Sequence, residues 1–411
     1  MKRIVCIATL DTKGAEVLYL KNLIQKRGHA VTVIDDGILG EPTFTPDITR
    51  EEVAAAAGAT LNEVISFGTQ DKASRIMPIG LTEIVKRLYS SGLLDAVIGI
   101  GGSIGTSMAT AAMRELPVGV PKLMVSTRAG LNESEKYVGT KDVTLMPSVC
   151  DIQGLNRITT RVLANAAGAV AGMAEAAEDK SEVSKRPLVV MSEVGSTTQC
   201  GLRVKSALES KGYEVVIFAG LGLGGKCQED FIRNNAVAGV IELSVYEISN
   251  ELFGGRHSSG PHRLEAAGER GIPQLITPGM VNIISFHAEN VPDSFKNRQE
   301  PRYPGVVAAY LNADQLKIVA KAIAKKLNRA TGPLKVLIPN RGFSSFSSKG
   351  FKLYDPMDER AFTDTLTADL GRSIVIREID SHINDVEFAD AVVNEFLELL
   401  AAVPEGRFSD E

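Results

Sequence analysis

The sequence contains no tryptophan, only 5% aromatic residues and four cysteines among its 411 residues. Cysteines this few, with no C-x-x-C pair among them, exclude a disulfide framework and a structural zinc site. The formal net charge of -5 and the lack of a basic stripe exclude non-specific nucleic-acid binding. No apolar run is long enough to span a membrane, and Asp11 and Lys13 end the first run too early for a signal peptide. We therefore expect a cytoplasmic protein without nucleic-acid or membrane partners.

Length and composition indicate a globular protein of two domains. A chain of 411 residues exceeds one ordinary core, and 44% hydrophobic residues with 38 glycines are typical of a loop-rich α/β protein. The stretch from Glu178 to Lys185 is polar and unpatterned, as linkers are. We place the boundary there, with an N-terminal nucleotide-binding subdomain at 1–183 and a C-terminal subdomain at 184–411.

The N-terminal segment alternates strands and helices. Arg3 to Thr9 is typical of a buried strand, Leu10 to Gly14 of a loop, Ala15 to Arg27 of a helix, and Val31 to Ile34 of a second strand. A strand–helix–strand unit predicts a parallel sheet with a right-handed crossover. The fold class is therefore α/β, with a Rossmann-like, doubly wound parallel sheet.

The most informative stretch is Val97–Thr110, in which an apolar strand ends in glycines and an alanine-rich helix follows at once. Glycines let a ligand approach the backbone closely, and the free N–H groups of a helix start attract an anion. Thr106 is also a candidate N-cap. The alternative is a tight strand-to-helix turn that needs its glycines for steric reasons alone. The candidate phosphate contacts are Gly101, Gly102, Ser103, Gly105 and Thr106.

The second half repeats the pattern of the first. Leu20–Ile34 resembles Val204–Phe218 in its helix, glycine and strand, and Val118–Met124 resembles Arg270–Ile276. Because the two similarities keep their order along the chain, we expect two Rossmann-like subdomains related by internal duplication. Independent use of a common helix–glycine–strand turn is the alternative.

Ligands of open parallel sheets bind beyond the carboxyl ends of the strands, which brings Asp11, Thr12 and Lys13 to the same rim as the glycine loop. Lys13 could contribute a charge for phosphate, and Asp11 could hold a ribose hydroxyl or a metal-bound water. Equally, Asp11 could cap a loop and Lys13 could be solvated. Lys72 and Arg75 could also reach the phosphates. Charged side chains such as these, however, more often lie on the protein surface.

Asp35 ends the second strand, where dinucleotide-binding folds keep their ribose-binding acid. The segment from Leu10 to Gly14, however, lacks the Gly-x-Gly-x-x-Gly turn of those folds. The sequence therefore argues against NAD as the ligand.

A second polar rim follows the strand at Ile374–Ile379. His382 could exchange a proton near neutral pH, and Asn384 could orient a hydroxyl or carboxylate of a small polar ligand. Asp385 completes this candidate catalytic set, although a helix cap at Asn384 or Asp385 is the alternative. Cys200 is either a nucleophile at a helix start or a buried structural thiol. The Arg256–Arg263 loop is the next candidate, and its histidines match no metal motif.

Five dispersed motifs together resemble one family, and they cover essentially the whole chain. The chain resembles the ATP-binding family that is named after the inhibitory domain of the tomato mosaic virus resistance protein. In this sequence the motifs are Ala8–Gly14, the Gly-Gly-Ser-Ile-Gly-Thr loop, Val120–Thr127, Ser259–Pro261 and His382–Asp385.

The resemblance implies two Rossmann-like subdomains, ATP in the N-terminal one, and a tendency to dimerise. We expect Mg²⁺ to accompany the ATP. By matching position, Asp11, Thr12, Lys13 and the loop from Gly101 to Thr106 become the nucleotide contacts. Ile104 stands where the family usually has glycine, and its β-branched side chain would resist positive φ and narrow the phosphate cradle.

Two functions follow from these observations. The first is an ATP-using or ATP-regulated enzyme, with the nucleotide in the first half and a small polar metabolite on the second rim. The alternative is a nucleotide-dependent protein-binding module, since in the plant member the domain binds a viral helicase. The His, Asn, Arg and Asp residues of the second half favour the enzyme.

Overall fold

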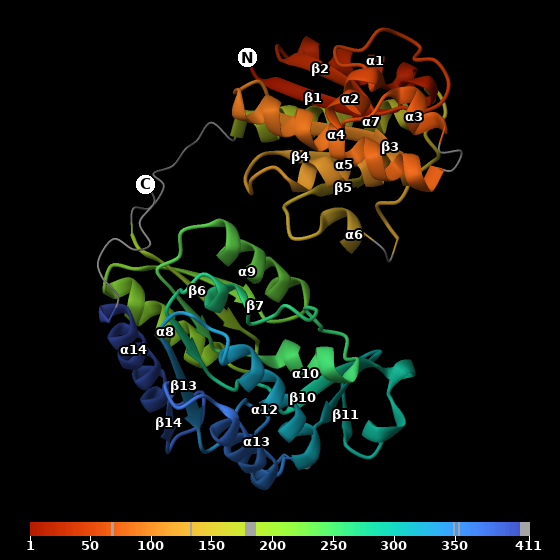
Figure 1. Ribbon diagram of the computed structural model, residues 1–411. Coiled ribbons are helices and arrows are strands. Elements are labelled where there is room, and N and C mark those ends of the chain that lie inside the picture. The colour runs from red at the N-terminus through yellow and green to blue at the C-terminus, as the bar shows by residue number, and fades with distance from the viewer. Residues whose placement is uncertain (67–69, 132–133, 177–185, 348–349, 352–353, 403–411) are drawn as a thin grey trace. The chain divides into compact units, whose positions relative to one another are not determined.

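The computed structural model describes residues 1–66, 70–131, 134–176, 186–347, 350–351 and 354–402 (Figure 1). The chain divides into two compact units, Met1–Val183 and Ser184–Glu411. Each unit is built on its own parallel sheet with helices on both faces. The expected α/β class with two Rossmann-like subdomains is therefore confirmed.

The first unit contains a five-stranded parallel sheet of order β2-β1-β3-β4-β5. Successive residues of the central strand β1 face opposite sides of the sheet. Val5 and Ile7 belong to one core, and Ile4 and Cys6 to the other. Because both faces are covered, the strand is a continuous apolar run. The strands are β1 (Arg3–Ala8), β2 (Ala30–Asp35), β3 (Ala96–Gly101), β4 (Lys122–Ser126) and β5 (Thr144–Pro147).

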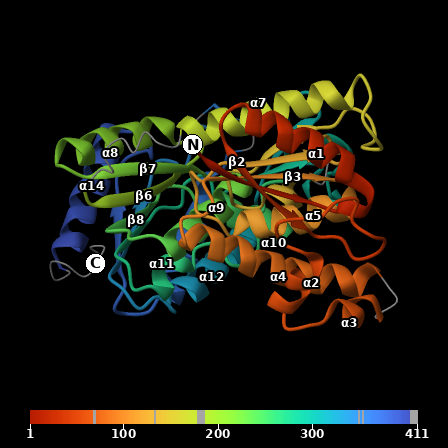
Figure 2. The same cartoon turned by 90° about the horizontal axis from the view of Figure 1, so that it is seen from above.

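Helices cover both faces of this sheet. α1 and α7 pack together on one face, and α2, α4 and α5 pack on the other (Figure 2). α3 packs against α2 and α4, and α6 packs against α5. The helices are α1 (Leu10–Lys26), α2 (Arg50–Ala56), α3 (Leu61–Ser66), α4 (Gln70–Ser90), α5 (Ser103–Arg114), α6 (Glu135–Val138) and α7 (Thr159–Ala176).

Two helix starts differ from expectation. α1 begins at Leu10 directly after β1, so the expected loop at Leu10–Gly14 is the first turn of the helix. The N–H of Lys13 donates to the carbonyl oxygen of Thr9, which closes that turn. The N-cap of α5 is Gly102, not Thr106, so that helix also begins earlier than its hydroxyl residues suggest. Each helix therefore starts immediately after its strand.

The second unit contains a six-stranded parallel sheet of order β7-β6-β8-β9-β13-β14. In both units the second strand lies outside the first, and the third lies on the first strand's other side. The shared order is the one that an internal duplication predicts. The strands are β6 (Leu188–Glu193), β7 (Glu214–Ala219), β8 (Gly239–Glu242), β9 (Gln274–Ile276), β13 (Leu334–Pro339) and β14 (Val375–Ile379).

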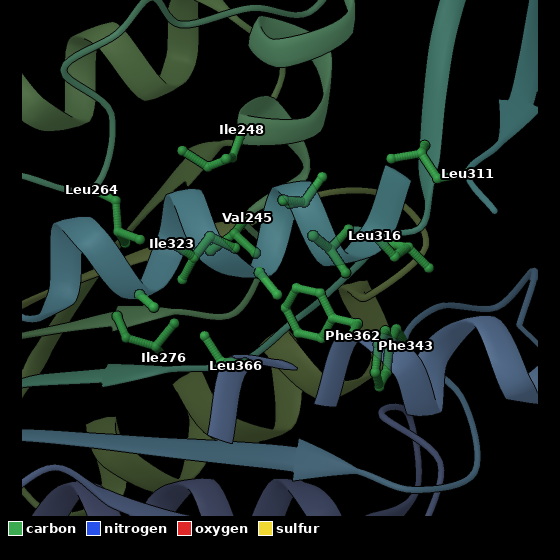
Figure 3. Close-up of a cluster of buried hydrophobic side chains, with 14 of the residues drawn as sticks. Val245, Ile248, Leu264, Ile276, Leu311, Leu316, Ile323, Phe343, Phe362 and Leu366 are labelled. Atoms are coloured by element: carbon green, nitrogen blue, oxygen red, sulfur yellow. The ribbon is translucent and has the colours of Figure 1, made fainter. Parts of the chain in front are cut away.

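Two cores flank this second sheet. α8 and α14 pack together over one face, where Val204 and Phe396 are fully buried. α12 and α13 pack over the other, where Leu316, Ile323 and Phe362 form the cluster drawn in Figure 3. The helices are α8 (Thr198–Ser210), α9 (Leu223–Asn234), α10 (Tyr246–Phe253), α11 (Ala266–Glu269), α12 (Ala313–Leu327), α13 (Pro356–Asp369) and α14 (Val386–Ala401).

A three-stranded antiparallel sheet is inserted between β9 and β13 and was not expected from the sequence. Its order is β10-β12-β11. It accounts for part of the extra length of the second half. The strands are β10 (Ile283–His287), β11 (Gln299–Tyr303) and β12 (Val306–Tyr310).

Candidate functional site

A cavity of about 520 Å³ lies at the carboxyl edge of the first sheet. Its walls come from the segments that follow β1, β2 and β3, together with α3 and α5. The sequence-based expectation of a shared rim is correct, because the two motifs line one cavity. The lining residues are Thr9, Asp11, Thr12, Lys13, Asp36, Ile38, Leu39, Val64, Ile65, Gly101, Gly102, Ser103, Ile104, Gly105 and Met108.

The strand order explains why a cavity forms at this edge. From β1 the chain crosses to β2 on one side of the sheet, and later returns to β3 on the other side of β1. Consecutive helices therefore cover opposite faces and leave a crevice between their starts. α1 and α5 both begin at this crevice, and the first N–H groups of a helix have no partner within it.

The glycine loop leaves room for a ligand. A Cβ at Gly101 would lie 2.8 Å from backbone atoms of Gly105 and Thr106, so this glycine lets the strand and helix pack closely. A Cβ at Gly102 would have only the Thr127 hydroxyl within 4 Å, at 3.9 Å. Gly102 also has an extended backbone that any residue adopts, with φ of -82°. Its missing side chain therefore leaves open space on the cavity wall.

The residues next to the glycines differ in their exposure and in their contacts. Ser103 and Ile104 line the cavity and are exposed. Ile104 lies within α5 and is not among the residues with positive φ, so the expected backbone conflict does not arise. Thr106 is fully buried, and its hydroxyl lies 2.6 Å from the Ser126 hydroxyl. Thr106 was expected to contact phosphate, but it does not line the cavity, and its side chain ties α5 to β4.

Asp11, Thr12 and Lys13 line the cavity from the first turn of α1. The Oδ1 atom of Asp11 is buried and has no hydrogen-bond partner. The alternative in which Asp11 caps a loop does not apply, since these residues are helical. The ammonium of Lys13 and the carboxylate of Asp11 therefore both lie beside the start of α1.

Asp35 and Asp36 have different environments although they are neighbours. Asp35 Oδ1 accepts hydrogen bonds from the backbone N–H groups of Leu10 and Gly37, at 3.0 and 2.9 Å. Asp35 does not line the cavity, whereas Asp36 does. Burial, together with the nearby carboxylates of Asp35 and Asp11, raises the pKa of Asp36 to about 7. The carboxylate that follows β2 and lines the cavity is therefore that of Asp36, one residue after Asp35.

One wall of the cavity is apolar, and the sequence analysis did not identify it. Val64 and Ile65 come from the short helix α3, Ile38 and Leu39 follow β2, and Met108 lies on α5. No motif marks such residues, because each is an ordinary apolar residue of its own element. The wall forms because the fold brings α3 beside the segment after β2 and beside α5.

Two further expected phosphate contacts do not line this cavity. Arg75 lies on α4 and is exposed, but it is not part of the lining. Lys72 belongs to the start of the same helix, and its side chain lies outside the described part of the structure. The cationic lining within the described residues therefore comes from Lys13.

A second cavity of about 610 Å³ lies at the carboxyl edge of the second sheet. It contains the rim expected from the sequence and adds residues from the start of α8 and the loop after β13. Most of its lining residues are polar. They are Gly195, Ser196, Gln199, Arg341, Ser345, His382, Asn384 and Asp385.

His382 is anchored at both ring nitrogens. Nε2 donates to the carbonyl oxygen of Ser344 at 2.9 Å, and Nδ1 accepts the backbone N–H of Asn384 at 3.1 Å. Neither nitrogen is left for a substrate proton in this arrangement. The expected role of His382 in proton exchange does not fit the geometry, which instead gives the ring a role in holding the loop.

Asn384 and Asp385 also hold the rim together. Asn384 donates to the carbonyl oxygen of Ser196 at 2.9 Å and accepts from the N–H of Cys200 at 3.3 Å. Asp385 occupies the N-cap position of α14, but its side chain accepts the N–H of His382 at 2.8 Å and makes no capping bond. Asp385 therefore stands at the N-cap position, as the capping alternative predicted. Its side chain, however, bonds to the N–H of His382 and not to an N–H of the helix.

Cys200 and His257 do not fit a catalytic role. Burial raises the pKa of the Cys200 thiol to about 12, so the thiolate nucleophile is disfavoured and the structural alternative holds. Burial, together with the charge of Arg256, lowers the pKa of His257 to about 4. His257 is therefore neutral near pH 7.

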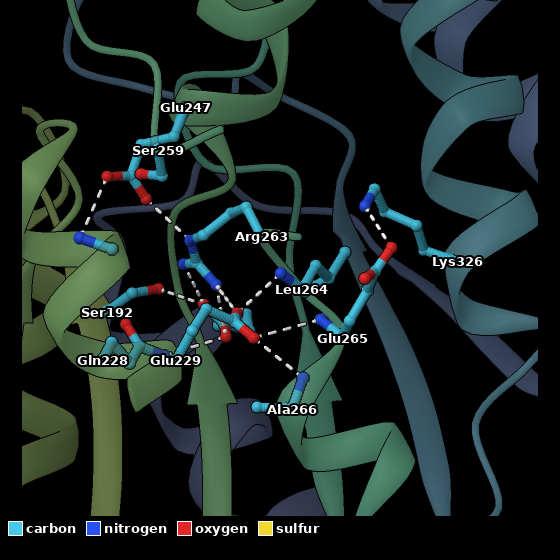
Figure 4. A network of polar contacts seen from close by, with 12 residues as sticks. Ser192, Gln228, Glu229, Glu247, Ser259, Arg263, Leu264, Glu265, Ala266 and Lys326 are labelled. Atoms are coloured by element: carbon cyan, nitrogen blue, oxygen red, sulfur yellow. Dashed lines mark hydrogen bonds and ion pairs between the residues drawn. The ribbon is translucent and has the colours of Figure 1, made fainter. Parts of the chain in front are cut away.

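The Arg256–Arg263 loop ends in a buried ionic network (Figure 4). Arg263 contacts Glu229 at 3.1 Å and Glu247 at 2.7 Å, and it also pairs with Glu242. These carboxylates accept further hydrogen bonds from backbone N–H groups and from Gln228 and Ser192. Since Arg263 is fully buried and each of its three guanidinium nitrogens pairs with a carboxylate, it joins β8, α9 and α10 and is not open to a ligand.

No group of three or more His, Cys, Asp or Glu in the described residues is arranged to hold a metal ion. In the same part of the chain, no helix is both long and apolar enough to cross a membrane.

The fold and the two cavities define a two-unit α/β protein with a cavity at the carboxyl edge of each parallel sheet. The chain belongs to the uncharacterised protein family UPF0261. Residues 2–179 match its N-terminal domain and residues 186–400 match its C-terminal domain. The expected family is thereby supported in part, since ATP binding is not among that family's described properties.

Curated relatives span the whole chain. A UPF0261 protein of Clostridium tetani is 38% identical over 404 residues, covering 97% of this chain and 99% of the relative. The ToMV resistance protein Tm-1(GCR237) of Solanum lycopersicum is 32% identical over 422 residues, covering 97% of this chain and 56% of the tomato protein.

Solved structures show only weak likeness. MurG of Acinetobacter baumannii is 12% identical with a TM-score of 0.23, covering 98% of each chain. The UDP-N-acetylglucosamine 2-epimerase of Rickettsia bellii is 11% identical with a TM-score of 0.23, covering 98% of this chain and 96% of that one. At these scores the likeness carries no argument about ligand or reaction.

Proposed function

We propose that the first unit binds ATP together with Mg²⁺. The observation that carries the proposal is that one cavity combines a glycine loop at a helix start, a carboxylate end and an apolar wall. These three surfaces match the phosphates, the ribose and the base of a nucleotide. A volume of about 520 Å³ is within the range of small-molecule sites.

The phosphate end would be the start of α5. Its unpaired backbone N–H groups and helix dipole favour an anion, and Lys13 adds a full positive charge on the same cavity. The open space at Gly102 would admit the phosphate close to the backbone. The base would rest against the apolar wall of Ile38, Val64 and Met108.

Mg²⁺ would enter the cavity bound to the phosphates of ATP. This ion usually keeps several waters and is held by substrate phosphates with one or two carboxylates. Asp11 is the carboxylate beside Lys13 on the cavity wall, and its Oδ1 has no partner. Asp11 therefore fits a role in contacting a water of the metal.

We further propose that the protein is an ATP-using or ATP-regulated enzyme, with a small anionic metabolite in the second cavity. The exposed guanidinium of Arg341 and the start of α8 both lie on that cavity and would favour a carboxylate or phosphate. A non-catalytic, nucleotide-dependent protein-binding module remains the second candidate. The tomato relative's printed name describes virus resistance, and this favours the second candidate.

The proposal extends to a cytoplasmic homodimer. The long helix α7 is rich in alanine and glycine, which allows close approach of another helix.

Calorimetric titration of the full chain with ATP and Mg²⁺ tests nucleotide binding. Gly102→Val should weaken the affinity about tenfold or more, since its side chain would occupy the phosphate's position. Gly130→Val is the control, because Gly130 does not line this cavity and a Cβ there has no neighbour within 4 Å. Absence of ATP binding by the wild type, or equal affinity of the wild type and Gly102→Val, would overturn the proposal.

A screen separates the enzyme from the module. Sugar acids and phosphorylated metabolites are tested by thermal shift with ATP present, and ATP turnover is measured with each compound that binds. An enzyme requires at least one compound that both binds and accelerates turnover. Compounds that bind without any ATP turnover would favour the protein-binding module, or a purely regulatory role of ATP.

A further inference from the structure

Asp36 lines the first cavity, and a hydrogen-bond partner is present for only one of its two carboxylate oxygens. Its side chain has 0% relative exposure and yet forms part of the wall of the first cavity. Oδ1 accepts the Thr9 hydroxyl at 2.8 Å, while Oδ2 is buried without a hydrogen-bond partner. Buried polar atoms are nearly always paired, so an unpaired carboxylate oxygen beside a cavity requires a partner from outside the protein.

The neighbouring Asp35 has a different role in the structure. It accepts two backbone N–H groups and lines a separate, smaller cavity and not the first one. The helix start and strand end are thus already stabilised by Asp35. Asp36 accepts the Thr9 hydroxyl and lines the crevice in which a ligand would lie.

We infer that Asp36 accepts a hydrogen bond from a ribose hydroxyl of the bound nucleotide, and that it makes the site select ribonucleotides over deoxyribonucleotides. The inference rests on the proposed nucleotide site and adds its sugar specificity. A carboxylate accepts from neighbouring hydroxyls, and a phosphate at the same place would be repelled.

The charges of the cavity therefore orient the ligand. Asp36 lies on its wall, and the carboxylate of Asp35 is close enough to raise the pKa of Asp36, so this part of the wall is acidic. The start of α5 with Gly102 is the end that favours anions. A nucleotide would place its phosphates at α5 and its sugar against Asp36.

The protonation of Asp36 supports the same assignment. In the free protein its pKa is raised to about 7, chiefly by burial and also by the charges of Asp35 and Asp11. Cys6 of β1 also lies close, but burial raises the pKa of its thiol to about 12, so it stays neutral. Lys13 is the cation on the cavity wall. A ligand hydroxyl that donates to the carboxylate favours its ionised form.

The experiment is a calorimetric titration of the full chain with ATP, 2′-deoxy-ATP and 3′-deoxy-ATP. Wild type should bind ATP at least about tenfold more tightly than one of the deoxy analogues, as expected for a hydrogen bond to a charged acceptor. Asp36→Asn keeps the acceptor for Thr9 and replaces Oδ2 by a donor, so the preference should fall to about twofold or less. Asp35→Asn is the matched control and should retain the wild-type preference.

Each outcome supports or overturns the inference. Equal binding of all three nucleotides by wild type overturns the sugar contact and leaves the nucleotide site standing, whether or not any variant folds. A preference that persists in a folded Asp36→Asn variant, as judged by circular dichroism, also overturns it. Failure of wild type to bind ATP removes the proposed function and this inference with it.

Discussion

The side-chain amide of Asn384 donates a hydrogen bond to the carbonyl oxygen of Ser196 over 2.9 Å, across 188 positions of the chain. This bond joins the loop after β14 to the loop after β6 at the carboxyl edge of the second sheet. Ser345, from the loop after β13, donates its N–H to the same oxygen at 3.1 Å. Three loops from distant parts of the sequence thus share one acceptor and enclose the second cavity.

The anchoring residues and the exposed cation of this cavity should respond differently to mutation. Asn384→Ala removes two cross-loop bonds and should lower the free energy of unfolding by about 1–3 kcal/mol. Arg341→Ala should change stability by less than about 1 kcal/mol, because its pairing with Asp380 is exposed. Arg341→Ala should instead abolish the thermal shift caused by an anionic ligand of this cavity. A ligand response that survives in Arg341→Ala would place the anion elsewhere.

Lys13 should act on the phosphates and not on the nucleoside. Lys13→Met removes its charge and should weaken ATP binding about tenfold, whereas the affinity for adenosine should be unchanged. Calorimetric titration with ATP, ADP and adenosine gives the comparison. Lys26→Met, at the other end of α1, is the control. Equal loss of affinity for adenosine would show that Lys13 shapes the cavity and does not bind phosphate.

Glu359 should make the second unit less stable as pH rises. Burial raises the pKa of this carboxyl to about 8, while its unfolded value is about 4.3. Between these two pH values Glu359 is protonated in the folded state and ionised in the unfolded state. Its contribution to the free energy of unfolding is therefore complete below about pH 4 and declines as the pH rises to about 8. The decline should be about 1.4 kcal/mol per pH unit inside that window.

The Glu359→Gln variant isolates this effect. It keeps an acceptor for the Asn282 amide, which donates to Glu359 at 2.9 Å, and removes the titrating group. Chemical unfolding at pH 6, 7 and 8 should show a smaller loss of stability in Glu359→Gln than in wild type. Parallel pH profiles of the two proteins would contradict the assignment.

The protein should be a homodimer at micromolar concentration. Light scattering coupled to gel filtration should give twice the monomer mass, with and without ATP. A single monomeric mass under both conditions would remove the dimer from the proposal.

The sequence by itself determined the alternation of strands and helices that opens each half and the two rims, but not the inserted antiparallel sheet. Long apolar runs bounded by glycines identify buried parallel strands, and 3.6-residue spacing identifies the helices between them. Because parallel strands end at one edge, Lys13 and Gly102 could be assigned to one rim from the sequence alone.

The tertiary structure alone decided which side chains serve that site. Successive residues point in different directions, so Asp36 and not Asp35 lines the cavity, a difference of one position that composition cannot reveal. Thr106 turns inward because Ser126, on the neighbouring strand, offers it a partner. His382 is held at both nitrogens by backbone groups, one of them 38 residues away. These choices depend on packing and hydrogen bonds between distant segments, which local sequence pattern does not encode.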